Sequence, residues 1–145
     1  MTMRPILALC ILIGCASTAA AQDYGQSGDW TIKVNPDNGN GCFMQKAFES
    51  GTLIQVGFVP DREGAFFAAY NPDWTTIIEG ETSDLLFDFG DSRFMGEVMG
   101  AMLDDVPGGY AYFDNPEFAS EFGRRQTVTL EGARGHTEAF DLAGS

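Results

Sequence analysis

Short runs of β-prone residues, separated by turn-forming residues, follow one another through most of this chain. In the first run Trp30, Ile32 and Val34 alternate with polar residues, which is the two-residue period of a strand with one buried face. The stretch 35–41 then ends the run with Asn, Pro, Asp and Gly, the residues that turns prefer. This pattern favours antiparallel strands joined by short turns.

The same pattern continues toward the C-terminus and predicts an all-β protein. About nine short strands in one domain are typical of an antiparallel β-sandwich or a partly closed barrel. The β-prone runs are 30–34, 42–48, 52–59, 65–70, 74–78, 85–89, 93–99, 110–113, 127–131 and 138–142.

The stretch 94–103 fits two structures, because its apolar residues also have a helical spacing. Gly96 and Gly100 would each weaken a helix by about 1 kcal/mol. We therefore expect a strand that runs into a turn or short helix at 101–104, followed by a turn at 105–109.

One short helix is expected near residues 115–124. An Asp or Asn cap, Pro116 at the first position and an acid in the first turn form a helix start. Phe118 and Phe122 lie four residues apart and therefore on one face. We expect this helix to pack both rings on the sheet.

The N-terminal segment 1–21 has the pattern of a signal peptide. It carries Arg4, an apolar stretch and small residues that permit a cut before Gln22. The domain would then be the single unit 22–145. Alternatively, the four residues ending at Cys15 form a lipobox and Cys15 is lipidated, and an uncleaved anchor is a third possibility. We expect a periplasmic or secreted protein, with a membrane-anchored lipoprotein as the alternative.

Composition limits the partners of this domain. The chain has 21 Asp and Glu against 8 Lys and Arg, a net charge of −13, yet 44% of its residues are hydrophobic. The apolar content indicates a folded core. The negative charge disfavours nucleic acid or an anionic membrane surface as the binding partner. The expected partner is a protein or a cationic ligand in the envelope, and a membrane only through a lipid on Cys15.

Cysteine usage predicts a free thiol. Cys10 leaves with the signal peptide, as does Cys15 in the favoured interpretation, so Cys42 has no partner for a disulfide. Cys42 begins an apolar run, and we expect a buried or half-buried thiol there. A reactive or intermolecular cysteine is the alternative.

Catalytic signals are weak, and no catalytic residue is expected. His136 is the single histidine and lies in a polar turn, which is typical of a solvated side chain. One histidine cannot build a His-rich zinc site, and no nucleotide-binding or nucleophile motif occurs. The prediction is a noncatalytic binding or interaction module with an acidic surface. The alternative is a small carboxylate-based hydrolase or lyase.

Two groups of residues are candidates for ligand contacts. Trp74, Tyr110 and Tyr112 are aromatic residues that could form a binding face, whereas Trp30 belongs to the core by its strand pattern. No cofactor is expected. Calcium is the alternative, at a loop that offers the oxygen ligands Asp37, Asn38 and Asn40 but a single carboxylate.

The chain resembles a known family in four places. These are Trp30 on an opening strand, the pair Gly41-Cys42, the run 90–96 after a Phe-rich strand, and the terminal run 140–144. Together they resemble the exported proteins related to invasion-associated locus B of alphaproteobacteria. The resemblance implies an envelope-located β-sandwich, linked in some pathogens to host-cell entry. This chain lacks the family's further cysteines, so the resemblance supplies no partner for Cys42.

Overall fold

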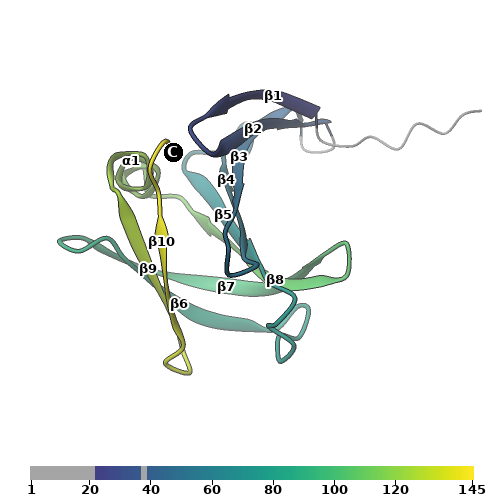
Figure 1. Cartoon of the computed structure of the whole chain (residues 1–145), viewed down its shortest axis with the longest axis vertical. Coiled ribbons are helices and arrows are strands. Elements are labelled where there is room, and N and C mark those ends of the chain that lie inside the picture. The colour runs from purple at the N-terminus through teal and green to yellow at the C-terminus, as the bar shows by residue number, and fades with distance from the viewer. Residues whose placement is uncertain (1–21, 37–38) are drawn as a thin grey trace, which may run out of the picture.

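The computed structural model describes residues 22–36 and 39–145, and Figure 1 shows them as one β-sheet with a single helix. The expected signal peptide with Cys15 therefore lies outside the described residues, as do Asp37 and Asn38. The strands are β1 (Gln22–Ser27), β2 (Trp30–Asn35), β3 (Gly41–Ala47), β4 (Leu53–Gly57), β5 (Ala65–Tyr70), β6 (Thr82–Asp88), β7 (Arg93–Leu103), β8 (Val106–Phe113), β9 (Thr127–Gly132) and β10 (Thr137–Asp141), and the helix is α1 (Pro116–Arg124).

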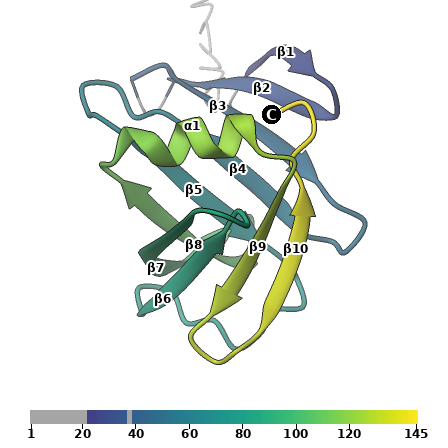
Figure 2. The ribbon, with the colours of Figure 1, turned by 90° about the vertical axis from the view of Figure 1, so that its left-hand side faces the viewer.

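The ten strands form one continuous sheet in the order β1-β2-β3-β4-β5-β8-β7-β6-β9-β10. Every neighbouring pair is antiparallel. The sheet bends so that β1–β5 and β6–β10 enclose a common interior, as Figures 1 and 2 show. It does not close into a barrel, because β1 and β10 remain as edges. The predicted all-β, sandwich-like class with one short helix is confirmed.

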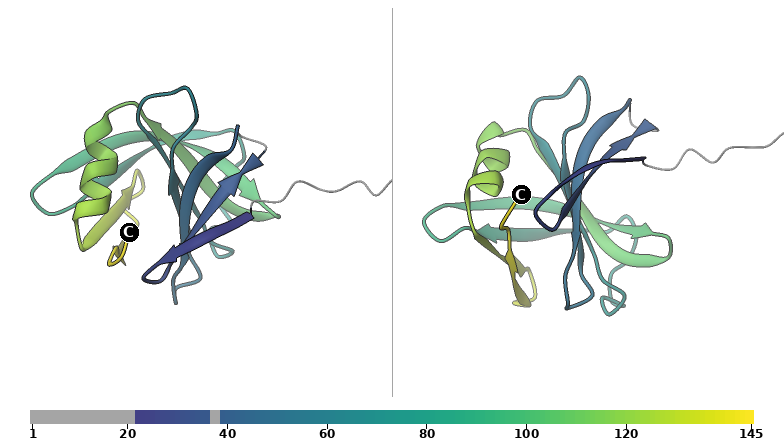
Figure 3. Two further views of the ribbon diagram at one scale, coloured as in Figure 1. Left: turned by 90° about the horizontal axis from the view of Figure 1, so that it is seen from above. Right: turned by 45° about the horizontal axis from the view of Figure 1, so that its top comes forward.

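Helix α1 lies at one end of the bent sheet, and the turn between β9 and β10 lies at the other (Figure 2). Figure 3 shows the same arch from above, with α1 along one side. Phe118 of α1 stacks on Phe113 of β8, with ring centroids 4.0 Å apart, and meets Phe87 of β6 edge to face at 5.1 Å. The ring centroids of Phe122 and of Trp30 on β2 are 5.9 Å apart. An aromatic core therefore fills the end of the interior beneath α1.

Local sequence accounts for α1. The Asn115 side chain caps the helix by accepting a hydrogen bond from the Glu117 backbone N–H at 2.9 Å, and Pro116 is the first helical residue, as expected. Glu121 is buried on the inner side, where its carboxylate accepts hydrogen bonds from Arg124, from Arg125 and from Ser92. Two guanidinium groups therefore neutralise this buried charge.

The elements differ from the expectations in three places. Residues 74–78 form turns in place of a strand, and β1 was not expected. The stretch 101–103 continues β7, and the turn consists of Asp104 and Asp105, with φ angles of 46° and 66°. Residues 106–109 therefore belong to β8. Within residues 22–36 and 39–145, no helix has the length and apolar character of a membrane span.

Glycines explain why β8 begins earlier than expected. A Cβ at Gly108 would lie 2.2 Å from the Ala69 carbonyl oxygen, and one at Gly109 would lie 2.5 Å from Val98 Cγ2. These positions in β8 need glycine because neighbouring groups pack against the strand there. Two adjacent glycines in a sequence normally indicate a turn, and here they permit close packing instead.

Candidate functional site

A pocket of about 490 Å³ is lined in part by the turn between β9 and β10, which lies at the end of the sheet opposite α1 in Figure 2. Its walls come from β5, β6, β7, β8, β9 and β10, from the loop 71–81 and from the turn 133–136. The apolar part of the wall consists of Phe67, Trp74, Ile77, Ile78, Leu85, Val98, Leu130 and Phe140, with Ala69, Gly100, Gly109, Gly132 and Ala133 as small residues between them.

Strand register explains why these side chains converge. Leu130 of β9 pairs with Phe87 of β6, and Gly132 pairs with Leu85, so their inner-face positions form continuous rows across the two strands. Where the row reaches Gly132, a Cβ would meet no heavy atom closer than 3.9 Å, the His136 carbonyl oxygen. The small residues therefore leave the space that a row of larger side chains would fill.

The loop 71–81 forms one wall of the pocket and is held at both ends. At its start the Asn71 side-chain oxygen accepts a hydrogen bond from the Asp73 N–H at 2.8 Å, and the Trp74 N–H donates to the Asn71 carbonyl at 3.1 Å. At its end Gly100 of β7 exchanges backbone hydrogen bonds with the loop, accepting from the Gly80 N–H and donating to the Glu81 carbonyl, each at 2.8 Å. Trp74 is therefore presented to the pocket by an ordered loop.

A buried hydrogen-bond chain joins this loop to the opposite wall. The Thr52 hydroxyl is fully buried and donates to the Glu138 carboxylate of β10, with 3.1 Å to Oε1. The same oxygen accepts from Asn71 Nδ2 at 2.9 Å and from the Ser50 hydroxyl at 3.2 Å. The Thr52 hydroxyl therefore uses its one donor and both of its acceptor positions. Glu138, half-buried in the pocket wall, is thus oriented from behind.

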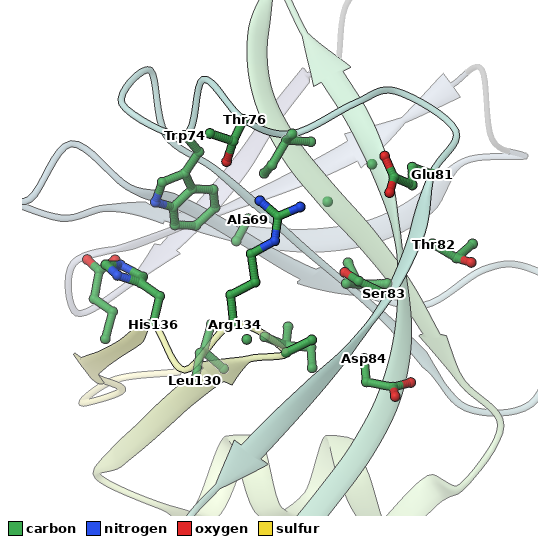
Figure 4. A pocket seen from close by; sticks show the side chains of 18 of the residues that line it. Ala69, Trp74, Thr76, Glu81, Thr82, Ser83, Asp84, Leu130, Arg134 and His136 are labelled. Carbon is green, nitrogen blue, oxygen red and sulfur yellow. The ribbon is translucent and has the colours of Figure 1, made fainter.

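The turn between β9 and β10 contributes two basic side chains. Arg134 and His136 both line the pocket, and Figure 4 shows the Arg134 guanidinium directed across it toward the loop that carries Trp74. Glu81 and Ser83 lie on the other side of the opening in that view, while Asp84 points away. The pocket therefore has an apolar interior and a polar, mixed-charge rim.

The structure separates the three aromatic residues that the sequence suggested for ligand binding. Trp74 lines the pocket. Tyr110 and Tyr112 alternate with the inward Gly109 and Ala111 and therefore lie on the outer face of β8, where Tyr110 stacks on Phe66 with ring centroids 5.6 Å apart. Burial raises the pKa of Tyr110 above its ordinary 10.0, against a smaller lowering by Arg62.

Tyr112 lies beside Tyr110 on the outer face of β8. The Arg62 guanidinium, which also acts on Tyr110, lies 3.7 Å from the centroid of the Tyr112 ring. Burial also raises the pKa of the neighbouring Tyr70 above 10.0. Two of the three aromatic candidates thus form an outer cluster away from the pocket.

Among the described residues Cys42 has no disulfide partner, and it is exposed, whereas a buried or half-buried position was expected. Cys42 lies near the start of β3, where it borders a smaller apolar hollow together with Ala119 and Gly123 of α1, and the gap between strand and helix leaves it accessible. The expectation of a half-buried thiol is therefore wrong.

The calcium expectation concerns a loop that is described only in part. Asn40 has a left-handed backbone, with φ of 62°, as turn residues often do. Asp37 and Asn38 lie outside the described residues. Among the described residues no group of three or more His, Cys, Asp or Glu side chains is placed to hold a metal. Calcium at this loop stays a prediction.

Sequence reasoning missed several pocket residues. Glu138 had a signal, since it shares the two-residue period of Phe140 and Leu142 and must face inward with them. His136 precedes Glu138 by two residues, and both line the pocket. Arg134, and Thr52 behind the pocket wall, had no such signal, because their surroundings or partners come from distant parts of the chain.

Comparison with models of protein families, with curated proteins and with solved structures gives no match to this chain.

Proposed function

We propose that this chain is an exported, noncatalytic binding protein whose inner pocket takes up a small, mainly apolar molecule. The observation that carries the proposal is the pocket of about 490 Å³ with apolar walls and a polar rim. Small-molecule sites in proteins have this composition and volumes of about 300–1,000 Å³. Export, argued from the segment 1–21, is part of the proposal.

The arrangement of the walls supports binding. Protein interiors are normally packed to the density of organic crystals, and unfilled apolar space costs stability. Here Ala69 and Gly132 are small residues beside Phe67 and other large apolar side chains, and at Gly132 a Cβ would meet no heavy atom closer than 3.9 Å. An apolar ligand in this space would regain the packing that the small residues forgo.

The alternative of a carboxylate-based hydrolase has one observation in its favour, since Asp73, His136 and Glu138 line the same pocket as Trp74. A general base is usually oriented by a hydrogen bond to a second catalytic group. Within the described residues, the hydrogen bonds of the Glu138 carboxylate come from Thr52, and His136 has no side-chain hydrogen bond. This favours binding over catalysis.

The surface charge adds a second feature to the proposal. With a net charge of −13, the outer surface favours a basic protein or another cationic partner over nucleic acid. Such contacts would involve the outside of the sheet and leave the pocket to the small ligand.

The test is to fill the pocket. A leucine side chain at Gly132 would enter the open space, because a Cβ there meets nothing closer than 3.9 Å and its φ is not in the left-handed region. We expect the folded protein to raise the fluorescence of the neutral probe N-phenyl-1-naphthylamine saturably, and Gly132→Leu to weaken this binding by at least about tenfold through steric overlap. Fluorescence titration measures both constants.

A matched control adds the same side chain elsewhere. A Cβ at Gly25 of β1 would also have no neighbour within 4 Å, and Gly25 lies at the far edge of the sheet. Gly25→Leu should bind the probe as the parent chain does, and urea unfolding should show that both variants are folded. Absence of saturable binding to the parent chain, or equal binding by Gly132→Leu, would contradict the proposal. Turnover of a bound ester or glycoside probe would favour the hydrolase alternative.

A further inference from the structure

We propose that the ligand of this pocket carries a carboxylate, which Arg134 binds, on an apolar body that lies against the inner wall. This inference rests on the proposed function and adds the chemical class of the ligand. Three features support it: which basic residues have protein partners, how the turn that carries Arg134 is held, and how the pocket beneath that turn is shaped.

Within residues 22–36 and 39–145, Arg134 has no protein partner, although the chain is rich in acids. Among the described residues it makes no hydrogen bond, ion pair or ring contact. Every other lysine and arginine of those residues has a partner. The pairs are Lys33 with Asp23, Lys46 with Asp29, Arg93 with Asp88, Arg124 and Arg125 with Glu121, and Arg62 with the ring of Tyr112.

The turn holds Arg134 at the opening of the pocket. The Gly132 N–H donates to the His136 carbonyl and the Gly135 N–H donates to the Gly132 carbonyl, each at 2.9 Å. Gly135 has a φ of 78°, a backbone conformation that glycine adopts without strain. This tight turn places Arg134 between its two hydrogen-bonded ends, and its guanidinium projects over the apolar interior in Figure 4.

The pocket below Arg134 suits an amphipathic acid. The guanidinium is a planar fork that binds a carboxylate through two parallel hydrogen bonds. Leu130, Val98 and Phe140 lie deeper and offer no polar group to a ligand, so the apolar body of the ligand would face inward. A head group at Arg134 and a tail on the inner wall satisfy both parts of the site together.

The acidic residues of the rim offer a competing ligand class, a cationic amphiphile. Glu138 is engaged by the Thr52 hydroxyl, and Asp84 lines the pocket but directs its carboxylate away from the opening in Figure 4. Asp73 and Glu81 are exposed, as Arg134 is, but exposed acids occur all over a chain with 21 of them. An arginine without a partner is the unusual feature of this surface, and it favours the anionic head group.

The experiment compares three ligands that share one tail. Decanoate, decanol and decylammonium carry a negative, a neutral and a positive head group, and each displaces N-phenyl-1-naphthylamine from the parent chain, Arg134→Gln, Arg134→Lys and Arg93→Gln. Arg93→Gln is the charge-matched control, because it removes a positive charge that is paired with Asp88 away from the pocket. We expect decanoate to bind the parent chain most tightly.

In Arg134→Gln the affinity for decanoate should fall by at least about tenfold, the usual effect of losing a charged hydrogen-bonding partner. Decanol should bind this variant as it binds the parent chain. Arg134→Lys should recover part of the loss, and Arg93→Gln should change nothing.

Two results would overturn the inference while leaving the proposed function intact. One is tighter binding of decylammonium than of decanoate, which would assign the head-group site to the rim carboxylates. The other is an equal loss of decanoate and decanol binding in Arg134→Gln, which would give Arg134 a structural role. If neither the three ligands nor the probe binds the folded parent chain, the proposed function itself fails.

Discussion

The single hydroxyl of Thr52 holds together three parts of the molecule that are far apart in sequence. It contacts Ser50 in the turn before β4, Asn71 at the start of the pocket loop, and Glu138 on β10. All of these partners direct polar atoms at one fully buried oxygen. The pocket wall therefore depends on a residue that does not itself line the pocket.

Replacing Thr52 by valine should destabilise the fold by about 1–3 kcal/mol. Valine keeps the shape of the side chain but removes the hydroxyl, so the Asn71 amide and the Glu138 carboxylate lose a buried partner, and unsatisfied groups of this kind cost about that much. Urea unfolding measures the change. Thr52→Ser, which keeps the hydroxyl, should lose clearly less stability than Thr52→Val. Equal losses of stability in the two variants would mean that Thr52 acts through packing and not through hydrogen bonding.

At this scale the sequence predicts some site residues and not others. Glu138 could be predicted to face inward, because it shares a strand period with Phe140 and Leu142. Thr52 could not, since its partners come from 19 and 86 residues away. Arg134 resembles any other polar turn residue until the pocket beside it is known.

Two glycines in β7 determine how that strand packs. Gly96 lies under Phe113, where a Cβ would be 2.5 Å from the ring, and Gly100 lies under the loop, where a Cβ would be 2.1 Å from the Ile78 carbonyl oxygen. In the sequence these glycines count against a helix. In the fold they make room for the aromatic core at one end of the strand and for the pocket loop at the other.

Gly96→Ala should destabilise the protein by about 1–3 kcal/mol, the typical cost of overpacking a filled core. The added methyl group must displace the Phe113 ring, which stacks on Phe118 at 4.0 Å. A double-mutant cycle with Phe113→Leu measures the coupling by urea unfolding, and the alanine should cost less where the ring is smaller. Additive effects would show that the Phe113 ring is not what Gly96 accommodates.

The elements that sequence predicted correctly are those with local causes. The cap and the first residue of α1 follow from Asn115 and Pro116 alone. The predicted strand at 74–78 fails because Trp74, Ile77 and Ile78 have strand-like side chains, but the backbone is turned locally at Asn71 and fixed at the other end by Gly100 of β7. Asn71 accepts hydrogen bonds from the Asp73 and Trp74 N–H groups, and Gly100 exchanges backbone hydrogen bonds with Gly80 and Glu81, a contact that exists only in the folded sheet.

For the whole molecule, the sheet order decides where the pocket lies. β5 pairs with β8 and β6 pairs with β9, so the loop 71–81 and the turn 133–136 reach the same end of the interior. Alternation along each strand indicates which residues face inward, but it does not give the order of ten strands. The fold class was therefore predictable, and the assembly of the site was not.

The net charge should make the stability of the whole chain depend on salt. The six ion pairs of the described residues involve five acidic side chains, against 21 Asp and Glu in the sequence. Most acids therefore repel one another across the surface, and screening weakens that repulsion. We expect the urea midpoint to rise as NaCl is raised from about 0.05 M to about 0.5 M, where the screening length falls to a few ångströms.

A charge-reduced variant tests whether repulsion is the cause. Asp104 and Asp105 are adjacent, exposed and left-handed, with φ angles of 46° and 66°, a conformation that asparagine tolerates at least as well. The double change Asp104→Asn with Asp105→Asn should stabilise the fold by about 0.5 kcal/mol at low salt, the scale of a surface charge effect, and should reduce the salt dependence. A urea midpoint of the parent chain that is independent of salt would mean that surface repulsion does not limit the stability of this fold. A gain in the variant that is as large at high salt as at low salt would mean that the turn prefers asparagine for its backbone conformation.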